Sequence, residues 1–148
     1  MEKGITFDNI KSIFNIEDKD IKTISPLVLA YIGDSVYDLI IKSILVARGN
    51  VPVNKLHKRA SELVKANAQV NMYDAVKDML TKEEEGVFRR GRNAKSYTTA
   101  KNATKIDYRM ATGYEALMGY LYMQGKVDRI YEVVSIGLKE VEDNGRDK

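Results

Sequence analysis

Apolar residues recur three and four positions apart through most of the chain, and only two prolines, Pro26 and Pro52, interrupt the pattern. This spacing gathers apolar side chains on one face of an α-helix, whereas a strand would need strict alternation. Strand signals are weak, and neither an internal repeat nor a low-complexity segment is present. We therefore predict an all-α fold.

The length of 148 residues suits one ordinary domain, and 44% hydrophobic with 30% charged residues is the composition of a globular protein. No apolar run approaches the roughly 18 residues of a membrane-spanning helix, and the N-terminus lacks the features of a secretory signal. We expect a single domain over residues 1–148, with its core at about 24–142 and a frayed C-terminal tail. We also expect a soluble, cytoplasmic protein that makes no contact with a membrane.

The longest predicted helix covers residues 26–48. Ser25 offers a capping hydroxyl, Pro26 suits the first helical turn, and Gly49 suits a helix end. Most positions from 27 to 45 are apolar and leave almost no polar face. The helix should therefore be central in the fold and buried on most sides.

Further helices are indicated by periodicity and capping. Residues 54–80 form an amphipathic helical region with a break near 67–71. Thr81 and Glu84 fit a capping box, so a short helix should begin at about Lys82 and end near the sequence RRGRN. The last two predicted helices cover residues 106–123 and 127–142, separated at Gly125.

The absence of cysteine excludes disulfides, thiolate zinc sites and thiol nucleophiles. A single histidine makes a histidine metal cluster or a Ser-His-Asp triad improbable. Any metal site in this chain should therefore use oxygen ligands.

Two carboxylates interrupt the two most apolar predicted helices: Asp34 in LAYIGDSVYDLI and Glu115 in ATGYEALMGYLYM. A buried carboxylate needs a cation, hydrogen-bond donors or a metal to remain charged. Small neighbours would let the two helices approach closely enough for both acids to share a site; they are Gly33, Gly113, Ala116 and Gly119.

Two converging carboxylates without histidine or cysteine suit a hard cation, and Mg²⁺ is commonly held by one or two protein carboxylates with water and substrate phosphate. We therefore expect Asp34 and Glu115 to hold a metal ion at a site that acts on phosphate esters. The alternative is that each acid has a structural role in a salt bridge or hydrogen bond. Asp38, one turn after Asp34, is best interpreted as a partner for Arg or Lys, with a supporting role at the site as the alternative.

Residues 89–105 carry six cations and no acid, together with amides and hydroxyls, and we predict a long functional loop there. This composition is typical of contact with a nucleic-acid backbone, although a solvated charged loop would look similar. The candidate RNA-binding residues are Arg89, Arg90, Arg92, Asn93, Lys95 and Lys101. A second basic cluster is interpreted as a solvated face: Lys55, His57, Lys58 and Arg59.

These motifs resemble the ribonuclease III catalytic domain. The family's Gly-Asp signature is similar to LAYIGDSVYDL, and its Glu-Ala-Leu signature is similar to GYEALMGYLYM. The short Mini-ribonuclease III branch matches best, through LHKRASELVKANAQ and EEEGVFRRGRNAKSYTTAKN as well. The resemblance extends over roughly residues 24–140, and several motifs in one order are more specific than any single motif.

The resemblance implies an all-helical, homodimeric endoribonuclease that cuts double-stranded RNA with Mg²⁺ and leaves 5′-phosphate and 3′-hydroxyl ends. Asp34 and Glu115 fall on the family's metal-binding, catalytic positions. The target implied for the Mini branch is the stem of precursor 23S ribosomal RNA, with a large-subunit ribosomal protein as a possible partner.

The chain departs from full-length ribonuclease III at two further acidic positions, which here are Ala30 and Thr112. The Mini branch has similar replacements, so these changes are compatible with activity. They keep open a catalytically silent, dimeric double-stranded-RNA-binding protein as an alternative. A helical protein-interaction module with structural Asp34 and Glu115 is the other alternative.

Overall fold

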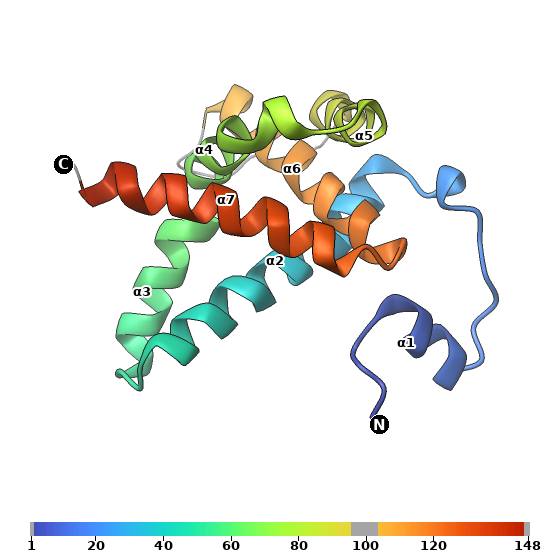
Figure 1. Cartoon of the computed structure of the whole chain (residues 1–148). Coiled ribbons are helices and arrows are strands. Elements are labelled where there is room, and N and C mark those ends of the chain that lie inside the picture. Colours follow the sequence, from blue (N-terminus) through green and yellow to red (C-terminus); the bar gives the residue numbers. More distant parts are fainter. Residues whose placement is uncertain (1, 96–103, 147–148) are drawn as a thin grey trace.

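The computed structural model describes residues 2–95 and 104–146, and within them the protein is helical with no strand (Figure 1). None of the helices in those two ranges is both long and apolar enough to cross a membrane. The helices are α1 (Phe7–Ile13), the 3-10 helix η1 (Ile21–Thr23), α2 (Pro26–Arg48), α3 (Val53–Val64), α4 (Ala66–Val76), the 3-10 helix η2 (Lys77–Met79), α5 (Lys82–Asn93), α6 (Lys105–Met123) and α7 (Val127–Arg146). The all-α prediction is confirmed.

Local capping sets the start of α2 and α5, as predicted. The Ser25 hydroxyl accepts a hydrogen bond from the Val28 N–H at 3.3 Å. In α5 the Thr81 hydroxyl accepts from the Glu84 N–H at 3.1 Å, and the Glu84 carboxylate accepts from the Thr81 N–H at 2.9 Å. Each cap satisfies backbone donors that the first helical turn leaves without a partner.

The central helix is α6, which packs against α2, α4 and α5 and is buried along most of residues 111–121. The prediction that α2 is buried on most sides is therefore wrong for the single chain. One face of α2 packs on α6, while the opposite face exposes apolar side chains, with Tyr31 79% exposed. The other exposed apolar residues of α2 are Leu27, Val28, Leu39 and Val46.

Two glycines bring α2 and α6 into backbone contact. A Cβ on Gly33 would lie 1.8 Å from the Glu115 carbonyl oxygen, and one on Gly119 would lie 1.9 Å from the Leu29 carbonyl oxygen. Close approach of these helices was predicted, but two of the four small residues serve another contact. Gly113 lies against Phe88 and Ala116 lies near Gly91, so both face α5.

The helical region after Pro52 breaks at Lys65, whose backbone is extended (φ −68°, ψ 160°). The predicted position, 67–71, was two residues too late. The Gln69 side chain donates a hydrogen bond to the Val64 carbonyl at 2.9 Å, which satisfies an acceptor at the end of α3. This contact stabilises the earlier break, and Asn67 and Asn71 both lie within α4.

Two other predicted segments need correction. Residues 89–93 are the last turns of α5 and Lys105 begins α6, so the predicted loop over 89–105 is shorter than expected. Residues 96–103 of that loop lie outside the described residues. The last helix also ends later than predicted, because α7 continues four residues beyond Glu142 to Arg146.

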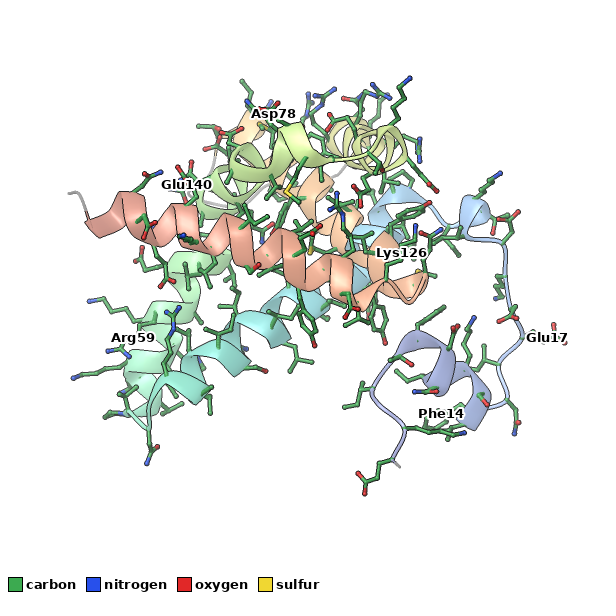
Figure 2. The ribbon with its side chains drawn as sticks, in the orientation of Figure 1. Phe14, Glu17, Arg59, Asp78, Lys126 and Glu140 are labelled. Atoms are coloured by element: carbon green, nitrogen blue, oxygen red, sulfur yellow. The ribbon has the colours of Figure 1, made fainter. Side chains whose placement is uncertain are left out.

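The N-terminal segment lies to one side of the other helices (Figure 1). It touches them through Phe7, whose ring meets Tyr122 edge-on at 5.8 Å between centroids. Phe14 and Glu17 project from this segment away from the packed helices (Figure 2), and Phe14 is exposed. This segment therefore contributes little to the core that positions the candidate site.

Candidate active site

Asp34 and Glu115 lie on the two helices that approach most closely. Gly33 precedes Asp34 and rests against the backbone of Glu115, so the side chains of the two acids leave neighbouring backbones. The Asp34 carboxylate is within hydrogen-bonding reach of Glu115 and repels its charged form. The structure thus brings together the two carboxylates that the sequence singles out.

The two acids differ in their surroundings. Asp34 is exposed in the single chain, which contradicts the expectation that it lies inside an apolar environment. Its position on the outer face of α2, one turn after Tyr31, explains the difference. Glu115 is partly buried beneath α3 and α4, so only one of the pair is removed from solvent by this chain alone.

The pKa of Glu115 rises to about 8. Burial is the largest cause, because it disfavours the charged carboxylate; the hydrogen bond and repulsion from Asp34 add to it, and the Gln69 amide opposes the shift. Within the described residues, no lysine or arginine forms an ion pair with either acid.

A divalent cation fits this arrangement. The site offers oxygen ligands from two carboxylates, and a cation there would relieve the repulsion between them. Asp34 is open to solvent, so waters and a phosphate oxygen could complete an octahedral shell. No group of three or more acidic, histidine or cysteine side chains suited to a metal occurs in residues 2–95 and 104–146.

Glu115 lies at the wall of a pocket of about 700 Å³ between α3, α4 and the start of α6. The two positions noted in the sequence for lacking an acid add no carboxylate to the site. Thr112 is buried and donates its hydroxyl hydrogen to the Tyr108 carbonyl at 3.0 Å, and Ala30 is buried and has no ligand atom in its side chain. The other polar lining residues are Ser61, Glu62, Lys65, Asn67, Gln69, Thr104, Asp107 and Tyr108.

Sequence reasoning missed Gln69, which touches Glu115 and is only 2% exposed. Its Nε2 atom donates to Glu115 Oε2 at 3.4 Å and to the Val64 carbonyl at 2.9 Å. Its Oε1 atom is buried without a hydrogen-bond partner in the described part of the chain. The only available signal was a glutamine at an apolar-periodic position of the amphipathic region.

None of the five candidate RNA-binding residues that the structure describes lines the Glu115 pocket. Arg89 lines a second pocket with Lys77 and Lys82, whereas Arg90 lines a third with Lys22 on another side of α5. The end of α5 therefore presents cations in more than one direction.

The remaining candidates follow along the same helix end. Arg92 is half-buried, with its guanidinium 5.9 Å from the centroid of the Phe88 ring. Asn93 accepts a hydrogen bond from Arg92 Nε at 3.2 Å and is exposed, as is Lys95. Lys101 lies outside the described residues.

Two other interpretations are supported by contacts and exposure. Asp38 forms an ion pair with Lys42 at 2.9 Å, as expected of a carboxylate one helical turn from a lysine. The second basic cluster is a solvated face of α3: Lys55, His57, Lys58 and Arg59 are all exposed.

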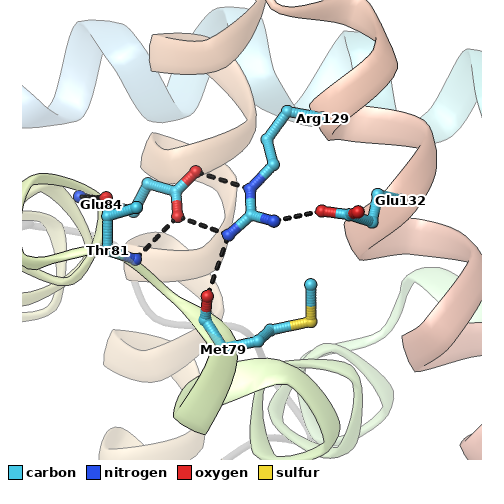
Figure 3. A network of polar contacts seen from close by, with 5 residues as sticks. All are labelled: Met79, Thr81, Glu84, Arg129 and Glu132. Atoms are coloured by element: carbon cyan, nitrogen blue, oxygen red, sulfur yellow. Dashed lines mark hydrogen bonds and ion pairs between the residues drawn. The ribbon is translucent and has the colours of Figure 1, made fainter.

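A second buried acid, Glu84, was not singled out beyond its capping role. Arg129 on α7 donates to Glu84 through Nε at 2.8 Å and Nη2 at 2.7 Å (Figure 3). Nη2 also donates to the Met79 carbonyl at 3.0 Å, and Glu132 pairs with the same guanidinium. The arginine holds the pKa of Glu84 below its usual value.

Comparison with known proteins identifies the family. The sequence profile of the Ribonuclease III domain matches residues 27–126. Mini-ribonuclease 3 of Brevibacillus brevis is 48% identical over 84% of this chain and 92% of its own, and that of a Thermoanaerobacter species is 46% identical over 82% and 85%. This chain belongs to the Mini-ribonuclease 3 branch of the ribonuclease III family.

A solved structure agrees with this assignment. The crystal structure of a protein from Fusobacterium nucleatum superposes with a TM-score of 0.74, at 28% identity, over 82% of this chain and 98% of that one. The predicted ribonuclease III-like fold is therefore confirmed. As a member of the Mini-ribonuclease 3 branch, the chain is an endoribonuclease; ribonuclease III enzymes act on double-stranded RNA and generally depend on a divalent metal.

Proposed function

We propose that this protein cuts double-stranded RNA at a Mg²⁺ site held by Asp34 and Glu115, leaving 5′-phosphate and 3′-hydroxyl ends. The observation that carries the proposal is a pair of adjacent carboxylates that no lysine or arginine of residues 2–95 and 104–146 balances by an ion pair. Such a pair is costly in its fully charged form unless a proton or an external cation neutralises it. The proposed catalytic domain comprises residues 1–148.

Each acid has a distinct part in this site. The main chain of Glu115 is fixed against Gly33, and this places the Glu115 carboxylate. The Asp34 carboxylate is exposed to solvent and can therefore meet a phosphate of the RNA. When bound, a divalent ion supplies positive charge that orients the attacking water and offsets negative charge developing on the phosphate. Both carboxylates must lose their protons for this role.

RNA binding is assigned to the end of α5 and the segment that follows it. Arg89, Arg90 and Lys95 are exposed and form no ion pair with an acid in the described residues, so they can meet phosphates without breaking such a pair. Arg92, Asn93 and Lys101 complete the proposed set. A-form shape should dominate recognition, because the deep major groove of RNA hides the base edges from side chains.

The exposed apolar face of α2 supports a homodimer. Leu27, Val28 and Tyr31 are 38%, 52% and 79% exposed, and Asp34 lies one turn beyond Tyr31. A contiguous apolar face of this kind is commonly covered by a partner. A second copy packed there would bring each Asp34 closer to the apolar environment that the sequence predicts.

In the cell, we propose that the substrate is the stem of precursor 23S ribosomal RNA and that a large-subunit ribosomal protein assists cleavage in the cytoplasm. The relatives' names include only the ribonuclease activity. This part of the proposal depends on the similarity of the LAYIGDSVYDL and GYEALMGYLYM motifs to those of the Mini-ribonuclease III branch.

The decisive experiment is cleavage of an end-labelled RNA duplex with and without Mg²⁺, comparing wild type with Asp34→Asn and Glu115→Gln. We expect metal-dependent cleavage by wild type and its loss in both variants, with folding checked by circular dichroism. Asp38→Asn is the matched control, because Asp38 is on the same helix but is paired with Lys42. It should cleave like wild type.

Two results would contradict the proposal. RNA binding without cutting by wild type would make the protein a silent RNA-binding member of the family. Full cleavage by folded Asp34→Asn or Glu115→Gln would remove that residue from the site.

A further inference from the structure

The carboxamide of Gln69 joins the break between α3 and α4 to the Glu115 carboxylate. Lys65 is extended, so α3 ends and the Val64 carbonyl lies beside the second turn of α4. Gln69 Nε2 donates to that carbonyl at 2.9 Å and to Glu115 Oε2 at 3.4 Å. One amide group thus contacts both the end of α3 and a proposed metal ligand, Glu115, which lies 46 positions after Gln69 in the sequence.

The orientation of the amide is determined by its two acceptors. Reversing it would place Gln69 Oε1 against the Val64 carbonyl and the Glu115 carboxylate, and three oxygens would then face one another without a hydrogen. In the observed orientation Oε1 is buried without a partner in the described residues. A buried acceptor without a donor costs stability, so an apolar residue would suit packing at this position better.

We infer that Gln69 is a positioning residue for the metal site. It holds Oε2 of Glu115 on the α4 side and limits rotation of the carboxylate, so that the group is ordered before a cation arrives. Gln69 itself supplies no ligand in this role. The inference rests on the proposed function, because Glu115 must be a metal ligand for its orientation to matter.

The test measures Mn²⁺ binding to the full-length protein by electron paramagnetic resonance of the free ion, without RNA. Gln69→Met keeps the length and volume of the side chain but cannot donate a hydrogen bond. We expect its dissociation constant for Mn²⁺ to rise about 10-fold, as commonly occurs when a partner of a metal ligand is removed. Gln124→Met is the matched control, since Gln124 is exposed at the end of α6 and its side chain donates to the Tyr120 hydroxyl, away from Glu115.

A cleavage assay separates positioning from a merely structural role. For Gln69→Met, the Mg²⁺ concentration that gives half-maximal cleavage should also rise about 10-fold. The RNA concentration at half-saturation should remain that of wild type. Gln69→Asn serves if Gln69→Met does not fold; it keeps an amide, but with one methylene fewer it cannot reach both acceptors, and the same loss is expected.

The outcomes distinguish the two proposals. Wild-type Mn²⁺ affinity in folded Gln69→Met, together with lost affinity in Glu115→Gln, would overturn the role of Gln69 alone. Wild-type affinity in Glu115→Gln would instead overturn the proposed metal site. A lower melting temperature for Gln69→Met with unchanged metal affinity would show that the amide only stabilises the α3–α4 break.

Discussion

Glu84, which is buried, and Glu115, which is partly buried, are both glutamates on helices, yet their electrostatic environments are opposite. Glu84 accepts two hydrogen bonds from Arg129 and one from the Thr81 N–H, and its pKa is lowered. Glu115 faces Asp34 and the Gln69 amide, and its pKa is raised to about 8. The protein balances the first charge internally and leaves the second to be balanced from outside.

This difference separates a structural acid from a candidate functional one. Burial alone does not, since Glu84 is the more buried of the two at 6% exposure. What distinguishes them is whether the fold supplies a cation. Glu84 connects the start of α5 to α7, whereas Glu115 opens onto a pocket and lies beside a solvent-exposed carboxylate.

The strongest test of the comparison exchanges each acid for its amide. Glu115→Gln should lower the cleavage rate about 1,000-fold, because several kcal/mol of transition-state stabilisation are lost, while stability at pH 7 is unchanged or higher. Glu84→Gln should show the reverse: near-normal cleavage per folded molecule and lower stability. Gel-based cleavage rates and urea denaturation of both variants measure the two effects, and equal loss of activity in both would erase the distinction.

Removing the cation from the structural pair should have the next largest effect. Arg129→Met leaves Glu84 buried with its charge uncompensated, and we expect the free energy of unfolding to fall by about 3 kcal/mol. Urea denaturation at pH 7 measures the loss. Lys139→Met, on an exposed position of the same helix, is the control and should change the midpoint little; an unchanged midpoint in Arg129→Met would show that the ion pair contributes nothing.

The raised pKa of Glu115 predicts a pH dependence of stability. The unfolded carboxyl titrates near 4.5 and the folded one near 8, so between these values the folded state binds the extra proton. The contribution is therefore fully present below about pH 4.5 and is lost as pH rises through about 8. We expect wild type to lose on the order of 2 kcal/mol relative to Glu115→Gln across this range, after allowance for solvent screening.

Denaturation midpoints of both proteins from pH 5 to pH 9 test this, and the difference between the two curves isolates Glu115. Adding Mg²⁺ should reduce the difference above pH 8, because a bound cation stabilises the charged form. Parallel curves for the two proteins would mean that the carboxyl titrates normally in the fold.

The smallest expected effects concern cations that are free to meet RNA. Arg89→Met or Arg90→Met should weaken duplex binding a few-fold and reduce the slope of log affinity against log salt by about 1 each. Fluorescence anisotropy over a range of salt concentrations measures this. Lys42→Met is the comparison, because Lys42 is already paired with Asp38, and a slope change as large as that of Arg89 would contradict the assignment.

The capped helix starts were the most predictable part of the structure. Ser25 with Pro26, and Thr81 with Glu84, satisfy backbone donors within four residues, so the start of α2 and α5 follows from local chemistry. Two other boundaries were predicted wrongly: the break was placed at 67–71 and lies at Lys65, and the last helix was ended at 142 and continues to Arg146. The break depends on a side-chain contact to the Val64 carbonyl, which periodicity does not reveal.

Residue types alone were enough to name the candidates for the chemistry: oxygen ligands only, two acids in apolar helices and a basic segment near residue 90. Packing was needed to show that Asp34 is exposed, that Gln69 touches Glu115 and that Arg129 neutralises Glu84. Residue types and caps act over a few positions, whereas burial and charge balance depend on side chains brought together from distant parts of the chain by packing.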